Sequence, residues 1–246
     1  MYALLKKRYG QNFLVDSNIT NKIAKLITHK NLNIIEIGPG DGKLTEKIFQ
    51  FEPEKLILIE IDKDLIPFLE TKFGKRKNIK IYNQDILSYE FQDDLELIIS
   101  NLPYNISSQI LVKLCLLEKP PKRLIFMFQK EFADRLLDKK INSLNSLISC
   151  FFDIKKEFNV SKNCFKPIPK VDSSVLSFER KEVFLIQIKE IENYIVFKRK
   201  IFSQKRKSLK NLLKDYKSDF SEYDLRKRVE EISLEKLIGI FRKINF

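Results

Sequence analysis

The chain has 246 residues, enough to bury a full core as one large domain or as one domain with a smaller appendage. Its 46 Lys and Arg residues against 33 Asp and Glu give a net charge of +13, which favours an anionic partner. No apolar run is long enough to span a membrane, and the basic start is not followed by a hydrophobic signal segment. We therefore expect a cytoplasmic protein without a membrane anchor.

The cysteines and the single histidine exclude several kinds of site. Cys115, Cys150 and Cys164 lie far apart, and His29 is the only histidine. Widely spaced, odd-numbered cysteines indicate reduced thiols and argue against a Cys/His metal site. Because nothing near His29 resembles a nucleophile system, a Ser-His or Cys-His mechanism is also disfavoured. We expect no metal.

Strands and helices alternate along the first two-thirds of the chain. Apolar runs predict strands at 32–37, 56–61, 79–82, 95–100 and 122–128, and helical periodicity predicts helices at 18–29, 43–50, 64–73, 107–117 and 130–138. This alternation indicates βαβ units, and hence a mainly parallel sheet covered on both faces. Two further β-like runs, 150–160 and 174–180, are expected to form an antiparallel hairpin at the sheet edge.

The character of the chain changes near residue 182. From there to residue 246 there is no proline, one glycine and a high density of charge. Three helices are predicted, at about 186–201, 203–216 and, with a break, 220–242. We therefore expect an α/β domain at 1–181 and a small all-α domain at 182–246.

A glycine-rich turn follows the first predicted strand. Glu36-Ile37-Gly38-Pro39-Gly40-Asp41-Gly42 holds three of the six glycines, which permit a tight turn and let a ligand approach the backbone. The spacing differs from the dinucleotide fingerprint, and no Walker-type lysine follows, so no phosphate cradle is indicated. S-adenosylmethionine, which has an adenosine and an amino-acid tail but no phosphates, fits this turn better.

Carboxylates stand at the ends of the next two strands. Glu60 ends the second strand and can accept hydrogen bonds from ribose hydroxyls, whereas Asp85, followed by Ile86, can accept from an adenine amino group. Each carboxylate alone is equally consistent with an ordinary strand end. Since successive parallel strands end at one edge of a sheet, the series favours a common adenosine site.

The fourth strand runs into Asn101-Leu102-Pro103-Tyr104. Proline stops both sheet and helix, so a stiff loop is predicted there. Such a loop offers an amide oxygen, a backbone carbonyl and an aromatic ring. Two acceptors on an exocyclic amine favour a pyramidal nitrogen with a usable lone pair, and a stacked ring holds the base. The alternative is a simple strand-ending turn, because Asn-x-Pro is common in turns.

These segments together resemble the ribosomal RNA adenine N6,N6-dimethyltransferases. The similar segments are residues 9–14, 36–42, 60–62, 84–86, 101–107, 128–131, 165–173 and 202–210. The resemblance implies a Rossmann-like, S-adenosylmethionine-dependent methyltransferase that releases S-adenosylhomocysteine. It further implies N6,N6-dimethylation of two adjacent adenosines in the 3′-terminal hairpin of small-subunit (16S) rRNA, carried out by a monomer on a pre-30S particle.

The resemblance also implies roles for individual residues. We expect donor contacts from Asn12, Leu14, Gly38, Gly40, Glu60, Asp85, Ile86 and Asn101. Asn101, Leu102, Pro103 and Tyr104 are expected to form the catalytic loop, and Tyr104 and Phe165 to stack on the target base. Phe165 precedes Pro167-Ile168-Pro169, a rigid segment suited to holding an exposed ring; a core phenylalanine is the alternative.

A dense cluster of positive charge lies in the C-terminal part. Between Lys198 and Lys214, eight of 17 residues are Lys or Arg. A solvated helix face is the usual meaning of such charge, but an RNA partner makes phosphate contacts the better interpretation. The residues expected to contact RNA are Lys198, Arg199, Lys205, Arg206, Lys207 and Lys210.

One segment departs from the family pattern, and two other functions stay open. Residues 141–148 stand where the family carries a Tyr-Gly-Arg-Leu-like element, which puts the docking of the substrate in question. The first alternative function is methylation of a large-subunit adenosine, as in macrolide resistance. The second is a non-catalytic RNA-binding factor for ribosome assembly on the same fold.

Overall fold

The computed structural model of the protein describes residues 12–91, 95–204 and 206–244. The chain forms two compact units, Met1–Ala133 with Ile154–Arg180 and Asp134–Asp153 with Lys181–Phe246. The chain passes from the first unit to the second for the last time between Arg180 and Lys181, next to the predicted boundary near 181. Residues 134–153, however, group with the second unit, although the sequence placed them in the first domain.

A seven-stranded sheet has the strand order β4-β3-β2-β5-β6-β9-β7. Its parallel part consists of β2 (Asn33–Ile37), β3 (Lys55–Glu60), β4 (Ile79–Asn83), β5 (Leu97–Asn101) and β6 (Arg123–Gln129). All five predicted strands are present, with ends within two residues of those expected. The order reverses between β2 and β5, the kind of switch point where open α/β sheets bind ligands.

The two later strands lie at one edge of this sheet. The strand β9 (Ser173–Arg180) pairs antiparallel with β6, and β7 (Phe152–Val160) lies outside it. The expected position at the sheet edge is confirmed. A separate pair of short strands, β1 (Phe13–Leu14) and β8 (Phe165–Lys166), joins the start of the described chain to the segment between β7 and β9.

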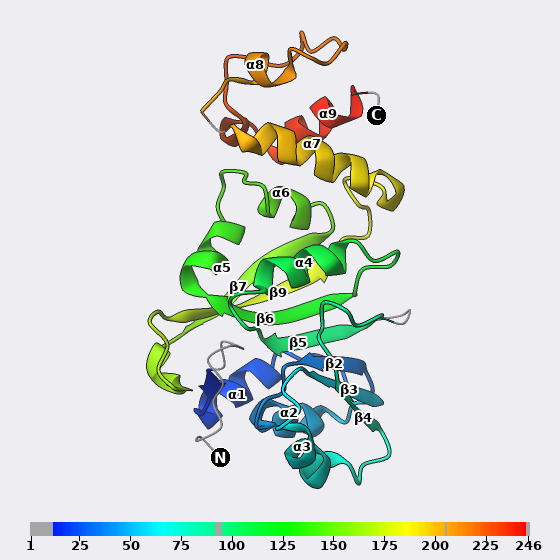
Figure 1. Ribbon diagram of the computed structural model, residues 1–246, viewed down its shortest axis with the longest axis vertical. Coiled ribbons are helices and arrows are strands. Elements are labelled where there is room, and N and C mark those ends of the chain that lie inside the picture. Colours follow the sequence, from blue (N-terminus) through cyan, green and yellow to red (C-terminus); the bar gives the residue numbers. More distant parts are fainter. Residues whose placement is uncertain (1–11, 92–94, 205, 245–246) are drawn as a thin grey trace. The chain divides into compact units, whose positions relative to one another are not determined.

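Helices cover both faces of the sheet. On one face α1 (Ser17–Ala24), α2 (Lys43–Ile48) and α3 (Ile66–Phe73) pack on alternate strand residues, and α4 (Ser107–Cys115) lies on the other side (Figure 1). The core on the first face includes Ile23, Ile48, Leu69, Ile34, Leu58, Ile99 and Ile125. Near-continuous apolar strands are what a sheet buried on both faces requires, so the α/β class is confirmed.

The second unit contains α6 (Asn145–Ile148), α7 (Ile191–Ser203), α8 (Leu209–Leu213) and α9 (Leu234–Arg242), while α5 (Lys130–Leu136) joins it to the first. The predicted helix 203–216 is much shorter than expected. Its first amides bond instead to a neighbouring segment, since Leu209 N–H donates to the Lys227 carbonyl. No helix in the described parts of the chain is long and apolar enough to cross a membrane.

Residues 134–153 belong to the second unit because their backbone is hydrogen-bonded to α7. The Tyr194 hydroxyl donates to the Ser146 carbonyl at 3.1 Å, and the Lys198 ammonium donates to the Ser143 carbonyl. Within the atypical segment 141–148, the Asn142 side-chain oxygen accepts the Asn145 N–H at 3.0 Å. Asparagine side chains thus hold this loop where the family element is missing.

Candidate active site

A pocket of the first unit opens at the carboxyl ends of β2, β3 and β5. It encloses about 990 Å³ of space, the part open to solvent included. The residues predicted to contact the donor all line it: Asn12, Leu14, Gly38, Gly40, Glu60, Asp85, Ile86 and Asn101. The structure therefore brings the ends of successive strands together as the sequence predicted.

The glycine turn forms one wall of the pocket. Gly38, Gly40 and Gly42 have φ values of 65°, 57° and 71°, a backbone conformation that favours glycine. A Cβ on Gly38 would meet nothing within 4 Å, whereas one on Gly40 would lie 2.7 Å from the Phe13 ring. Gly38 thus leaves the wall open to a ligand, and Gly40 makes room for Phe13.

Glu60 both lines the pocket and holds this turn. Its Oε2 accepts the Gly40 N–H at 3.1 Å, and its Oε1 accepts the Asp62 N–H at 2.9 Å. Burial raises the pKa of this carboxyl, against the lowering effect of those two backbone hydrogen bonds. Asp85 is positioned differently, since its Oδ1 accepts the Leu87 N–H at 2.8 Å in a local turn.

Glu36 is a pocket residue that the sequence analysis did not select. It lies at the end of β2, is 1% exposed, and accepts the Thr45 hydroxyl hydrogen at 2.6 Å. Burial raises its pKa to about 8, with repulsion from Glu60 and Asp41 adding to the shift and the Thr45 hydrogen bond opposing it. The sequence could have indicated Glu36, because it lies two residues before Gly38, at the strand end that borders the predicted donor site.

We expect Glu36→Gln to flatten the pH dependence of stability. A carboxyl whose folded pKa is about 8 stabilises the fold fully below its unfolded pKa of 4.5 and loses that stabilisation as pH rises through about 8. The wild-type free energy of unfolding should thus fall between pH 5 and pH 9 by up to several kcal/mol more than that of the variant. Urea denaturation of ligand-free protein at both pH values measures this difference. Glu70→Gln, an exposed control, should keep the wild-type slope; equal slopes for Glu36→Gln and wild type would contradict the assignment.

The lining suits a cationic donor rather than a polyphosphate. Four acidic residues face the pocket, namely Glu36, Asp41, Glu60 and Asp85. One lysine also lines it, and its ammonium pairs with the Asp41 carboxylate at 2.8 Å. Glu36, with its pKa of about 8, is mainly neutral near pH 7, and Asp41 is paired. The lining still offers carboxyl acceptors and no unpaired lysine among the described residues, which favours a sulfonium or ammonium group over a pyrophosphate. With the open wall at Gly38, these residues fit S-adenosylmethionine.

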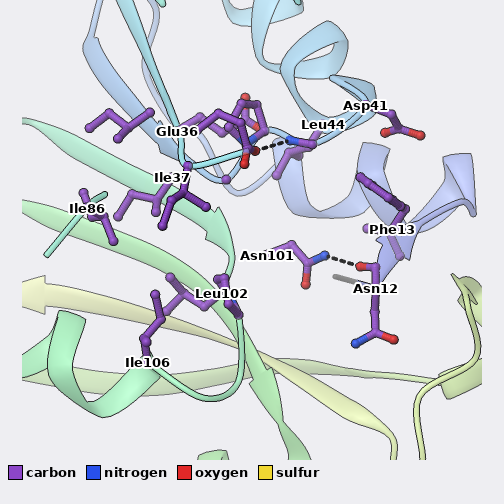
Figure 2. A pocket seen from close by; sticks show the side chains of 18 of the residues that line it. Asn12, Phe13, Glu36, Ile37, Asp41, Leu44, Ile86, Asn101, Leu102 and Ile106 are labelled. Atoms are coloured by element: carbon purple, nitrogen blue, oxygen red, sulfur yellow. Dashed lines mark hydrogen bonds between the residues drawn. The ribbon is translucent and has the colours of Figure 1, made fainter. Parts of the chain in front are cut away.

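The loop after β5 orients its asparagine toward the pocket. The Asn101 Nδ2 donates to the Asn12 backbone carbonyl at 3.1 Å, as Figure 2 shows. This bond fixes the orientation of the amide, whose oxygen is the only atom of the side chain that can accept a hydrogen bond from a ligand. The Pro103 carbonyl is used within the loop, accepting from the Ile106 N–H and the Ser107 hydroxyl. Leu102 is buried and lines the pocket with Asn101.

Tyr104 is fixed by a residue from a distant strand. Its hydroxyl lies 2.8 Å from the Ser173 Oγ at the start of β9. Burial raises the pKa of Tyr104, and the Ser173 hydrogen bond opposes that shift. The tyrosine is therefore a neutral phenol whose ring is held at the pocket lining. Ser173 was not selected from sequence, although it ends the segment 165–173 that resembles the family.

Phe165 does not present an exposed ring. It is 1% exposed, pairs with Leu14 across the β1–β8 ladder, and belongs to the hydrophobic core. It is also absent from the pocket lining, unlike Tyr104. The expectation of an exposed stacking ring is therefore wrong for this structure. The physical reason is the strand pairing, which turns Phe165 inward.

Comparison with known proteins identifies the family. The family model for ribosomal RNA adenine dimethylase matches residues 3–244. The chain belongs to this family. It is 39% identical, over 98% of its length and 93% of the relative's, to a protein named ribosomal RNA small subunit methyltransferase A from Hydrogenobaculum. A dimethyladenosine transferase structure from Plasmodium falciparum is 28% identical with a TM-score of 0.79, covering 94% of this chain and 98% of that one. A 23S rRNA methyltransferase structure, 24% identical with a TM-score of 0.76 and covering 95% and 99%, shares the fold.

The basic residues of this dimethylase family member divide into buried and exposed ones. Lys198 is 6% exposed, and its ammonium is directed at the Ser143 carbonyl, so the expectation that it lies on an RNA-facing surface is wrong. This hydrogen bond compensates in part for the burial of the charged group beside α6. The exposed residues are Arg199, Arg206, Lys207 and Lys210. Lys205 lies outside the described residues, as do Tyr9, Gly10 and Gln11 of the N-terminal motif.

Proposed function

We propose that this protein methylates the N6 nitrogen of adenosines in small-subunit rRNA, with S-adenosylmethionine as the donor. The observation that carries the proposal is the orientation of Asn101, whose amide nitrogen is tied to the Asn12 carbonyl at the lining of the donor pocket. That orientation leaves the amide oxygen to accept from the target amine. A binding protein without catalysis would have no need for it.

Catalysis rests mainly on positioning and on acceptors for developing positive charge. When bound, S-adenosylmethionine supplies a methyl group to N6: a carbon–nitrogen bond forms, the carbon–sulfur bond breaks with its electron pair left on sulfur, and the extra proton passes from nitrogen to water. The Asn101 oxygen and the Leu102 carbonyl hold the amine hydrogens and stabilise the cation that forms on nitrogen. Tyr104, held through Ser173, stacks on the adenine ring.

The small-subunit assignment follows the names of the relatives, and its finer details follow the resemblance of the sequence motifs to the family. We propose dimethylation of two adjacent adenosines in the 3′-terminal hairpin, on a pre-30S particle in the cytoplasm, by a monomer. The small subunit as the substrate is supported by the relative named small-subunit methyltransferase, at 39% identity over nearly the full chain. The large-subunit alternative has the weaker support, because the 23S enzyme at 24% identity shares only the fold.

The test is to offer the protein undermethylated small subunits and large subunits together with S-adenosylmethionine, and to map the methylated nucleosides. We expect N6,N6-dimethyladenosine in small-subunit RNA alone. Modification confined to large-subunit RNA would establish the alternative of a large-subunit adenosine methyltransferase. Donor-independent RNA binding without any methylation would establish the alternative of a non-catalytic assembly factor.

We propose that the exposed cations of the second unit contact RNA phosphates. Arg199, Lys207 and Lys210 are exposed on or beside α7 and α8. Replacing all three with glutamine should weaken RNA binding and flatten the plot of log affinity against log salt concentration by about 2–3, because each lost phosphate contact removes roughly 0.7–0.9 from the slope. Filter binding between 50 and 300 mM salt measures it.

The matched control removes three exposed lysines from the first unit, Lys63, Lys75 and Lys77. Both triple variants lose the same net charge. If they lower affinity and salt slope equally, binding follows overall charge, and the proposed surface on the second unit is refuted.

A further inference from the structure

A closed loop links β7 to β9 in the first unit. It runs over residues 162–172, and Asp172 fastens its two ends: the Asp172 Oδ1 accepts the Lys162 N–H at 2.9 Å. The Asp172 carbonyl in turn accepts the Lys130 N–H, also at 2.9 Å, at the end of β6. The base of the loop is therefore fixed to the sheet.

Both arms of this loop are attached to the lining of the pocket. In the first arm, β8 pairs with β1, so that Phe165 lies opposite Leu14, a pocket residue. In Figure 1 this yellow-green segment lies beside the blue start of the described chain. After the second arm, Ser173 bonds to the Tyr104 hydroxyl. The loop thus stands at the rim of the site that receives the target base.

The tip of the loop carries an exposed apolar side chain. Ile168 is 62% exposed and lies between Pro167 and Pro169, whose fixed φ angles stiffen the tip. A single exposed aliphatic side chain is common on protein surfaces, but Ile168 differs in its place on a stiff loop whose arms are fastened to the pocket lining. Lysines surround it in the chain, and Lys162, Lys166 and Lys170 are all exposed.

We propose that Ile168 is a wedge that packs into the RNA stack next to the target adenosine, while the neighbouring lysines contact phosphates. Apolar wedges of this kind compensate for the unstacking of bases, and an adenosine must leave its stack to reach Asn101. The lysines favour a polyanionic partner over an apolar protein surface. This inference rests on the proposed function and adds a residue that helps to extrude the base.

The test compares Ile168→Ala with wild type on two kinds of undermethylated small-subunit particle. One carries the native hairpin, and the other has a mismatch in the base pair next to the target adenosines. A mismatch lowers the cost of unstacking, so a wedge matters less there. On native particles we expect Ile168→Ala to lower kcat/KM roughly tenfold, the scale of the lost burial of an aliphatic side chain. On mismatched particles the loss should be clearly smaller, and Ile168→Leu should restore most of the rate on both.

Two controls keep the outcome specific. Leu116→Ala removes another exposed apolar side chain of the first unit, 42% exposed, and should leave both rates at the wild-type level. The dissociation constant for S-adenosylmethionine should be unchanged in Ile168→Ala. Equal losses on native and mismatched particles, or no loss on native ones, would overturn the wedge. If wild-type protein methylates neither particle, it is the proposed function that fails.

Discussion

Replacing Asn101 with alanine is expected to reduce kcat by about 10²–10³, the usual effect of removing one preorganised polar group from a reaction site. The amide oxygen is the acceptor that holds the target amine, and its orientation is set by the 3.1 Å bond from Nδ2 to the Asn12 carbonyl. Because the interaction strengthens as charge develops on nitrogen, the loss should appear in kcat more than in the affinity for RNA.

Single-turnover methylation of small subunits, with saturating donor, measures this effect. Asn105→Ala is the matched control, since Asn105 is an exposed amide in the same loop. RNA affinity should stay within a few-fold of wild type in both variants. Retained turnover in Asn101→Ala would refute the catalytic role, and an equal fall in both variants would indicate general damage to the loop.

The sheet and the pocket were predictable because both depend on local patterns. Short apolar runs such as Leu97–Ile99, alternating with helical patterns, indicate buried strands, and parallel strands deliver their carboxyl ends to one edge of a sheet. Once Glu60, Asp85 and Asn101 were each assigned to a strand end, their convergence followed from topology. That is why these three residues line the pocket, whereas Asn12 and Leu14, which also line it, were expected only from the family resemblance.

The errors concern contacts between segments far apart in the chain. Phe165 was expected to be exposed, yet its pairing with Leu14 buries it, and no pattern near Phe165 reveals a partner about 150 positions earlier. Lys198 was assigned to a charged surface, but a carbonyl of the 141–148 segment accepts from it. The same long-range bonds explain why residues 134–153 join the second unit. Charge and hydrophobicity alone do not specify such pairings.

Replacing Glu60 with alanine is expected to weaken S-adenosylmethionine binding by about 10²–10³, since hydrogen bonds to a charged acceptor contribute roughly 1.5–3 kcal/mol each. The loss has two sources. The carboxylate is the proposed acceptor for the ribose hydroxyls, and its Oε2 also accepts the Gly40 N–H, which shapes the turn. Titration calorimetry measures the affinity, and Glu70→Ala, an exposed glutamate on α3, is the control that should match wild type.

A thermodynamic cycle that combines one mutation with one change in the ligand separates these two sources of the lost affinity. S-adenosylmethionine and its 2′-deoxyribose analogue are each titrated into wild type and Glu60→Ala. If Glu60 accepts from that hydroxyl, the analogue binds wild type more weakly, but both ligands bind the variant equally. If Glu60 only supports the glycine turn, removing the hydroxyl costs the same affinity in both proteins, because the lost interaction lies elsewhere. Faster amide exchange at Gly40 in the variant would then account for its weak binding, and the ribose assignment would be refuted while the donor site itself stood.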